Sequence, residues 1–236
     1  MVRVFFSYKM MKDYIIVGSG LAGIAIAETL LQHNKSFVVF ENQSQNSSSI
    51  AGGLYNPVIL KRFSQVWNAN QQLELANSFY AAIEKKLEFQ FDFKIPIYRK
   101  FFSIEEQNNW FTASDKPLLS NYLGSEIETL NNQAVASNFK FGKVHHTGFL
   151  DTKKLKEAYT HFLLSNSMYI EETFDYSKIH IENNYIQYNN IRAKQLVFAE
   201  GFGLHSNPYF NNLPLDGTKG ELLIIKSENL NLKETL

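Results

Sequence analysis

Three glycines near the N-terminus have the residue type and spacing to bind a pyrophosphate. They lie between an apolar run and a stretch with helical periodicity, in the segment Gly18, Ser19, Gly20, Leu21, Ala22, Gly23. In such a turn the first glycine permits the bend and the second lets the pyrophosphate approach the backbone. The third lets the helix and strand pack closely, and the helix N-terminus offers free N–H donors to the anion. The segment therefore predicts a dinucleotide site, although a glycine-rich turn in another kind of α/β protein has the same pattern.

A carboxylate follows at the distance that a dinucleotide site requires. Glu41 comes directly after the apolar run 37–40, about 20 residues beyond the glycines. There it can accept hydrogen bonds from ribose hydroxyls and repel a 2′-phosphate, so NADP is disfavoured. FAD and NAD both stay open at this point.

Two further stretches of small residues can bring the backbone close to a ligand. Residues 47–57 run from three serines through two glycines to a proline, and the apolar run 196–198 is followed by Ala199, Glu200 and Gly201. Exposed N–H groups in such stretches can lie against a phosphate or a flat ring. Each stretch alone is equally typical of a loop or a strand-terminating turn.

The predicted elements place these stretches at the ends of strands. Short apolar runs predict buried parallel strands, and apolar spacings of three and four predict helices. The expected strands are 14–17, 37–40, 168–174, 195–199 and 222–225, and the expected helices are 23–34, 73–87 and one beginning at 151 or 152. Residues 43–49 are expected to form a loop, 91–146 short antiparallel strands, and 179–191 a hairpin.

The composition of the chain excludes several classes of function. Its 236 residues carry 23 basic and 23 acidic side chains, so no whole-chain field recruits nucleic acid or an anionic membrane. Without cysteine, disulfides, thiolate metal sites and a cysteine nucleophile are excluded, and a cytoplasmic location is expected. No run of apolar residues is long enough to span a bilayer. His145 and His146 point to opposite faces of a strand, so no metal site is expected.

Together the motifs resemble those of FAD-dependent oxidoreductases of the D-amino-acid oxidase and glycine oxidase superfamily. The glycine turn with Glu41, residues 51–57, 146–151 and 196–201 occur in the family's order, over nearly the whole chain. Residues 53–57 look most like the flavin-dependent half of the bacterial enzyme that trims a carboxymethylaminomethyl group on tRNA wobble uridine. The resemblance implies an amine or amino-acid substrate, with tRNA as an alternative partner. Basic residues are too scattered along the chain to predict a tRNA surface.

The resemblance also implies an architecture. It is an α/β fold, with a Rossmann-like FAD-binding domain, built on a parallel sheet with helices, and an inserted, mainly antiparallel substrate domain. The FAD-binding domain would be discontinuous, at 12–88 and 147–210, and the substrate domain would occupy 89–146 and 211–236, after an extension at 1–11. The family normally continues well past this length, so the substrate domain is expected to be incomplete.

Individual site residues follow from the resemblance rather than from the pattern. FAD would be the cofactor, with Ser48 near its pyrophosphate. Phe174 would hold the adenine through its backbone, and Gly201 would pack against the cofactor. The residues implied beside the isoalloxazine ring are Gly52, Gly53 and Leu54.

Two departures from the family pattern concern chemistry. Glu200 places a carboxylate where the family tends to have a small hydroxyl. The arginine that pairs with a substrate carboxylate usually lies in the part of the family beyond this length, so no residue is assigned that role. No catalytic side chain is assigned either, because hydride transfer from an amine to flavin requires no side-chain base.

Two other readings stay open. An NAD-dependent dehydrogenase would use the same glycine turn and Glu41, although residues 51–57 argue against it. A non-catalytic or truncated cofactor-binding module would have the same first domain without an active site. No feature of the sequence predicts an oligomeric state.

Overall fold

The computed structural model describes residues 11–45, 47–130, 132, 134–135, 137–227, 230, 232 and 235–236. The chain divides into two compact units. The first unit combines Met1–Ala51 with Thr152–Glu221, and the second combines Gly52–Asp151 with Leu222–Leu236. Apart from Met11, the extension expected at 1–11 lies outside the described residues.

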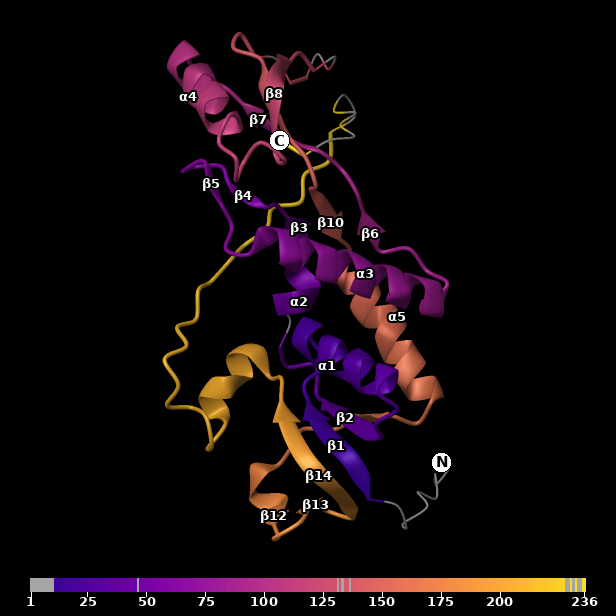
Figure 1. The fold of residues 1–236 in the computed structure, drawn as a ribbon. Coiled ribbons are helices and arrows are strands. Elements are labelled where there is room, and N and C mark those ends of the chain that lie inside the picture. Colours follow the sequence, from indigo (N-terminus) through magenta and orange to yellow (C-terminus); the bar gives the residue numbers. More distant parts are fainter. Residues whose placement is uncertain are drawn as a thin grey trace. The chain divides into compact units, whose positions relative to one another are not determined.

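A mixed six-stranded sheet forms the centre of the first unit (Figure 1). Its order is β11 (Tyr169–Glu171), β2 (Phe37–Glu41), β1 (Lys12–Val17), β14 (Ile191–Phe198), β13 (Ile186–Tyr188), β12 (Ile179–Ile181). The first four strands pair in parallel, and β14, β13 and β12 pair antiparallel. The parallel strands and the hairpin predicted from the apolar runs are confirmed, and β11 is shorter than the expected strand 168–174.

Helices α1 (Leu21–Gln32) and α5 (Thr152–Ser165) contact each other and the sheet of this unit. α1 lies against β1 and β2 (Figure 1), and α5 contacts β11. The buried Tyr159 of α5 donates a hydrogen bond to the buried Glu28 of α1, at 3.0 Å. Because a buried carboxylate needs such donors, this bond fixes the two helices in register.

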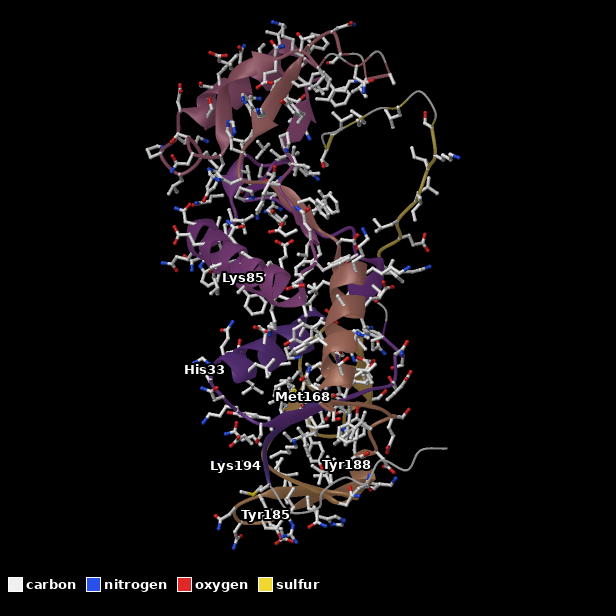
Figure 2. The ribbon with its side chains drawn as sticks, turned by 90° about the vertical axis from the view of Figure 1, so that its right-hand side faces the viewer. His33, Lys85, Met168, Tyr185, Tyr188 and Lys194 are labelled. Atoms are coloured by element: carbon white, nitrogen blue, oxygen red, sulfur yellow. The ribbon has the colours of Figure 1, made fainter. Side chains whose placement is uncertain are left out.

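Aromatic side chains fill the core that includes Ile15, Val17 and the hairpin β12–β13. The ring of Phe174 stacks on that of Tyr188, labelled in Figure 2, at 4.1 Å, and Phe40 meets both rings edge-on. Tyr188 is fully buried, and its hydroxyl accepts a hydrogen bond from the Asp175 N–H. The cluster therefore fixes the backbone that follows β11.

The described residues of the second unit form three small antiparallel sheets and two helices. The sheets are β3 (Leu54–Tyr55) with β10 (Gly148–Leu150) and β6 (Asp92–Phe93), β4 (Val58–Ile59) with β5 (Ser64–Gln65), and β7 (Ile97–Lys100) with β9 (Phe141–Val144) and β8 (Leu123–Glu128). The helices are α3 (Ala69–Leu87) and α4 (Ile104–Ser114). The α/β class, with a Rossmann-like parallel sheet and small antiparallel sheets, is confirmed. No helix in the described part of the chain is long and apolar enough to cross a membrane.

Two helices lie where strands or loops were expected. α4 falls inside the region 91–146, where only short strands were predicted, and that prediction is wrong for residues 104–114. Ser103 caps α4 by accepting a hydrogen bond from the Glu106 N–H at 3.1 Å, and the Glu106 carboxylate binds Arg99. The four-residue helix α2 (Ser47–Ile50) replaces the end of the loop predicted for 43–49.

The strand expected at 222–225 is absent from the described chain. These four residues have no strand assignment, and the side chains of Leu223 and Ile224 are 88% and 96% exposed. An extended segment becomes a strand only when a neighbour satisfies its backbone groups. The strand predicted at 222–225 rested on apolar residues alone, and that prediction is wrong because no neighbouring strand pairs with the segment in the described chain.

Trp110 is the largest fully buried side chain of the second unit. Its ring meets Phe101 and Phe63 edge-on, and its indole N–H donates to the Gly124 carbonyl at 2.8 Å. A Cβ on Gly142 would lie 2.5 Å from the indole ring, so that glycine makes room for it. The chain's other tryptophan, Trp67, is 82% exposed.

The two tryptophans allow a matched test of this core. Trp110→Ala should lower the free energy of unfolding by about 3–5 kcal/mol, because it opens a cavity and orphans a carbonyl. Trp67→Ala should change it by less than about 0.5 kcal/mol. Urea denaturation followed by far-ultraviolet circular dichroism measures both. Equal losses in the two variants would contradict the packing described here.

Candidate functional site

A cavity of about 320 Å³ opens in the first unit where four parallel strands end. Loops that follow β1, β2, β11 and β14 form its walls, together with the start of α1 and α2. Ligands of open α/β sheets bind at this edge, beyond the carboxyl ends of the strands. The lining residues are Val17, Gly18, Gly20, Leu21, Ala22, Phe40, Glu41, Asn42, Ser44, Gln45, Ser47, Ser48, Glu172, Thr173, Phe174, Tyr176, Ala199, Glu200, Gly201, Phe202, Gly203 and Ser206.

At two of the three glycines in the turn 18–23, the backbone is packed so closely that no other residue type fits. Gly18 has a φ of +102°, and a Cβ there would lie 2.3 Å from the carbonyl oxygen of Ala199. A Cβ on Gly23 would lie 2.0 Å from the carbonyl oxygen of Gly18. No side chain fits at either position, so the turn brings β1, α1 and β14 together at one point.

The start of α1 is arranged to accept an anion. Gly20 is its N-cap residue and offers no side chain to the free N–H groups of the first turn, where Leu21 N donates to Ser48 Oγ at 3.2 Å. A helix N-terminus carries a partial positive charge and unsatisfied donors. Because Gly20, Leu21 and Ala22 line the cavity, these donors and the dipole are available to a phosphate.

Glu41 fastens the glycine turn to the end of β2. The residue is 7% exposed, and its two carboxylate oxygens accept hydrogen bonds from Ser19 N and Gln43 N, each at 2.6 Å. Each carboxylate oxygen has a second lone pair. The carboxylate can therefore hold the turn and still accept a hydrogen bond from a ribose hydroxyl.

Ser19 carries an unpaired polar atom next to this bond. Its side chain is 1% exposed, and its hydroxyl has no hydrogen-bond partner among the described residues. Buried hydroxyls normally have a partner. Together with the glycine N-cap of α1, this atom shows that the turn has hydrogen-bonding capacity that the described chain does not use.

Polar groups beyond β2 and β11 form a second wall. Asn42 donates to Thr173 Oγ1 at 3.3 Å, and Phe174 follows with its ring packed on Tyr188. The backbone at Phe174 is therefore held in place while its ring is in the core. This arrangement fits the contact with adenine through the backbone that the resemblance implied.

Glu200 forms a third wall at the end of β14. Its carboxylate accepts hydrogen bonds from the Tyr176 hydroxyl and, at 2.7 Å, from the side-chain amide of Asn207. Burial and the adjacent Glu200 carboxylate raise the pKa of Tyr176 above its ordinary value. Tyr176 therefore stays protonated and donates this hydrogen bond throughout the physiological pH range.

The structure brings together most of the site residues predicted in the first unit. Those that line the cavity are Gly18, Gly20, Leu21, Ala22, Glu41, Ser48, Phe174 and Gly201. Ser19 and Gly23 lie behind them, as the hydrogen bond to Glu41 and the contact with Gly18 show. That these residues bind a cofactor stays a prediction.

The other three predicted residues belong to the second unit. Gly53 has a φ of +66°, and a Cβ on it would lie 1.9 Å from the Leu150 carbonyl oxygen. Gly52 precedes it, and Leu54, on β3, is 54% exposed. Position 53 therefore requires a glycine, because its backbone lies directly against β10. Their contact with an isoalloxazine ring stays a prediction.

Several residues of the cavity were not predicted from the sequence. Asn42 and Gln45 follow β2, Glu172 and Thr173 follow β11, and Phe202, Gly203 and Ser206 belong to the 3₁₀ helix η2 (Gly201–Ser206) after β14. The rule that sites lie beyond the carboxyl ends of parallel strands could have found the first four. Nothing in the sequence indicates that η2 folds back toward the cavity.

Three comparisons with solved structures and one with a family model bear on the fold. Residues 16–82 match the model of an NAD(P)-binding Rossmann-like domain. Glycine oxidase from Bacillus cereus ATCC 14579 is 20% identical with a TM-score of 0.57, over 80% of this chain and 55% of that protein. L-amino acid deaminase from Proteus vulgaris is 16% identical with a TM-score of 0.62, over 88% of this chain and 51% of its own.

The third structure contains a cofactor. FAD-bound L-alpha-glycerophosphate oxidase from Mycoplasma pneumoniae is 15% identical with a TM-score of 0.52, over 80% of this chain and 53% of its own. The chain therefore spans about half the length of the structures it matches. At these identities the likeness shows the fold alone, and the glycine oxidase-like fold that the resemblance implied is confirmed.

Replacing one carboxylate oxygen tests the role of Glu41 in the turn. Glu41→Gln places an amide NH₂ against one of two backbone N–H donors, so the free energy of unfolding should fall by about 1–3 kcal/mol. The exposed Glu182, on the same unit, gives the control Glu182→Gln, which should have an effect below about 0.5 kcal/mol. Urea denaturation measures both. A Glu41→Gln variant as stable as the wild type would show that the carboxylate does not hold the turn.

Proposed function

Because the chain has the fold of the FAD-dependent amino-acid oxidases of the glycine oxidase type, we propose that it is an FAD-dependent oxidoreductase acting on the C–N bond of an amine or amino acid. The observation that carries the proposal is the N-terminus of α1, whose N-cap glycine offers no side chain and which meets the cavity beside a carboxylate suited to ribose. Both features belong to dinucleotide sites.

The residues of the cavity fit the two phosphates and the adenosine half of FAD. The N–H groups of the first turn of α1, with Ser48, would hold the pyrophosphate. Glu41 would accept hydrogen bonds from the ribose, and the backbone at Phe174 would contact the adenine. Gly201 would allow the chain after β14 to approach the cofactor.

FAD is favoured over NAD by the resemblance and by one of the solved structures. The resemblance implies that Gly52 and Gly53 lie beside an isoalloxazine ring, which NAD lacks, and FAD is bound in the matching glycerophosphate oxidase. The family model describes an NAD(P)-binding domain, and FAD and NAD share the adenosine diphosphate half that this part of the fold binds. An NAD-dependent dehydrogenase is the second candidate.

The proposed reaction removes a hydride from the carbon that bears the amine. Bound FAD would supply the acceptor for that hydride, while the resulting imine is hydrolysed by water to a carbonyl compound and ammonia or a shorter amine. The contribution of this chain would be positioning and the exclusion of water, which require no side-chain base. Glycine and L-amino acids appear in the names of the matching enzymes, which supports an amine or amino acid as substrate.

An aspartate at Gly20 separates cofactor binding from folding. Gly20 has the extended conformation of an N-cap, and a Cβ there would meet only Ser48, with Oγ 3.1 Å away. Aspartate is a preferred N-cap, so Gly20→Asp should stabilise the fold by about 0.3 kcal/mol. The same carboxylate would occupy the free N–H donors and repel the pyrophosphate, so FAD affinity should fall by about tenfold or more. Quenching of flavin fluorescence measures the affinity, and thermal denaturation measures the stability.

Gly20→Ala is the matched control, since it adds the Cβ without the charge. It should bind FAD more tightly than Gly20→Asp does. If Gly20→Asp bound FAD as tightly as the wild type, the pyrophosphate would not lie at the start of α1, and the proposal would lose its main support.

The proposed activity is tested directly on the flavin-loaded protein. Under anaerobic conditions, an amine or amino acid from a broad panel should bleach the absorbance of bound FAD. Bound FAD that no member of the panel reduces would favour a non-catalytic cofactor-binding module. Tight binding of NAD with no binding of FAD would favour the dehydrogenase.

A further inference from the structure

The carboxylate of Glu200 joins the two ends of a short 3₁₀ helix. Glu200 is the N-cap residue of η2, and Asn207 is its C-cap residue. The Asn207 side chain donates to Glu200 Oε2 at 2.7 Å, and the Tyr176 hydroxyl donates to Oε1. One side chain therefore connects both ends of η2 to the segment that follows β11.

The two side chains that donate hydrogen bonds to Glu200 are each held in place by other contacts. Asn207 is fully buried, and its side-chain oxygen accepts a hydrogen bond from Tyr209 N at 2.9 Å. Its NH₂ group is thereby directed toward Glu200, because turning the amide over would break the bond to Tyr209. Tyr176 is held by ring contacts with Phe174 and Phe198. Both donors are therefore held in position by contacts that do not involve the carboxylate.

η2 is a short 3₁₀ helix, so it needs contacts with other segments to hold it in place. It has six residues, and short 3₁₀ helices have poor hydrogen-bond geometry and little intrinsic stability. It has no buried residue of its own. Gly201, Phe202, Gly203 and Ser206 from this helix nevertheless line the cavity.

We propose that Glu200 is a positioning residue, which holds η2 in place as one wall of the cofactor cavity through its bonds to Tyr176 and Asn207. The effect on the cofactor rests on the proposed function, whereas the effect on η2 does not. A threonine or serine, the residue type usual at this position in the family that the chain resembles, is too short to join both partners. The carboxylate therefore replaces a small hydroxyl with a side chain that organises the segment.

Amide hydrogen exchange tests the positioning without any cofactor. In Glu200→Ala, the amide hydrogens of Gly203 and Asn207, which donate within η2, should exchange about tenfold faster than in the wild type. The amide hydrogens of β14 should exchange at an unchanged rate. Unchanged exchange in η2 would overturn the proposal, whether or not the protein binds FAD.

FAD affinity tests the consequence for the cavity. Glu200→Ala should weaken binding by about tenfold, because η2 is no longer held. Glu200→Gln should stay within about threefold of the wild type, since its amide can accept from Asn207 while donating to the Tyr176 oxygen. Tyr176→Phe removes one of the two hydrogen bonds, so its FAD affinity should lie between those of Glu200→Gln and Glu200→Ala. Glu182→Ala, on the exposed hairpin, is the control and should bind FAD as the wild type does.

The outcomes separate the two proposals. A wild type that binds no FAD would overturn the proposed function, and the exchange experiment would still decide the positioning of η2. Wild-type FAD affinity in Glu200→Ala would overturn the role of Glu200 in the cavity. If Glu200→Gln were as weak as Glu200→Ala, the negative charge and not the pair of bonds would be required, and the positioning role would be wrong.

Discussion

The first unit depends on one contact between backbones, at the end of β1. Gly18 lies against the carbonyl of Ala199 on one side, and Gly23 of α1 lies against Gly18 on the other. Strand, helix and neighbouring strand approach so closely there that a methyl group would collide with a carbonyl oxygen. Close-packed interiors cannot absorb such an overlap without shifting an element. The contact therefore ties the end of β14 and the start of α1 closely to the end of β1.

Polar groups at this edge of the sheet hold the loops that the contact brings together. Glu41 binds the glycine turn, Asn42 binds Thr173, and Glu200 binds Tyr176 and Asn207. The bonds of Glu41, of Asn42 and of Tyr176 with Glu200 join segments at the ends of different strands, whereas Asn207 and Glu200 lie at the two ends of η2. Because parallel strands end side by side, such loops are neighbours in space although they are distant along the chain. The edge is therefore cross-linked by side chains, while the N-cap residue of its helix, Gly20, offers no side chain to the first turn.

Local patterns predicted the parts of the fold that depend on local physics. Glycine spacing, apolar runs and helical periodicity located the turn, β1, β2, β14 and three helices, because steric limits and burial act within a few residues. α4 also had a local signal, the serine and glutamate at 103 and 106, which form part of a capping box. The bonds of Glu200 could not be predicted, because they depend on where Tyr176 and Asn207 lie after folding. The segment 222–225 failed as a strand for the same reason, since strand pairing is a long-range property.

The glycine turn leaves polar groups without partners in the described chain, which is itself an argument for a ligand. A glycine N-cap stabilises a helix less than aspartate or serine does, and a buried hydroxyl without a partner is destabilising. Gly20 and Ser19 combine these two features within two adjacent residues, beside the buried carboxylate of Glu41. Proteins tolerate such local conflicts chiefly at functional sites. The unused donors of α1 and the lone pairs of Glu41 are complementary to a phosphate and a ribose, so a bound dinucleotide would satisfy what folding alone leaves open.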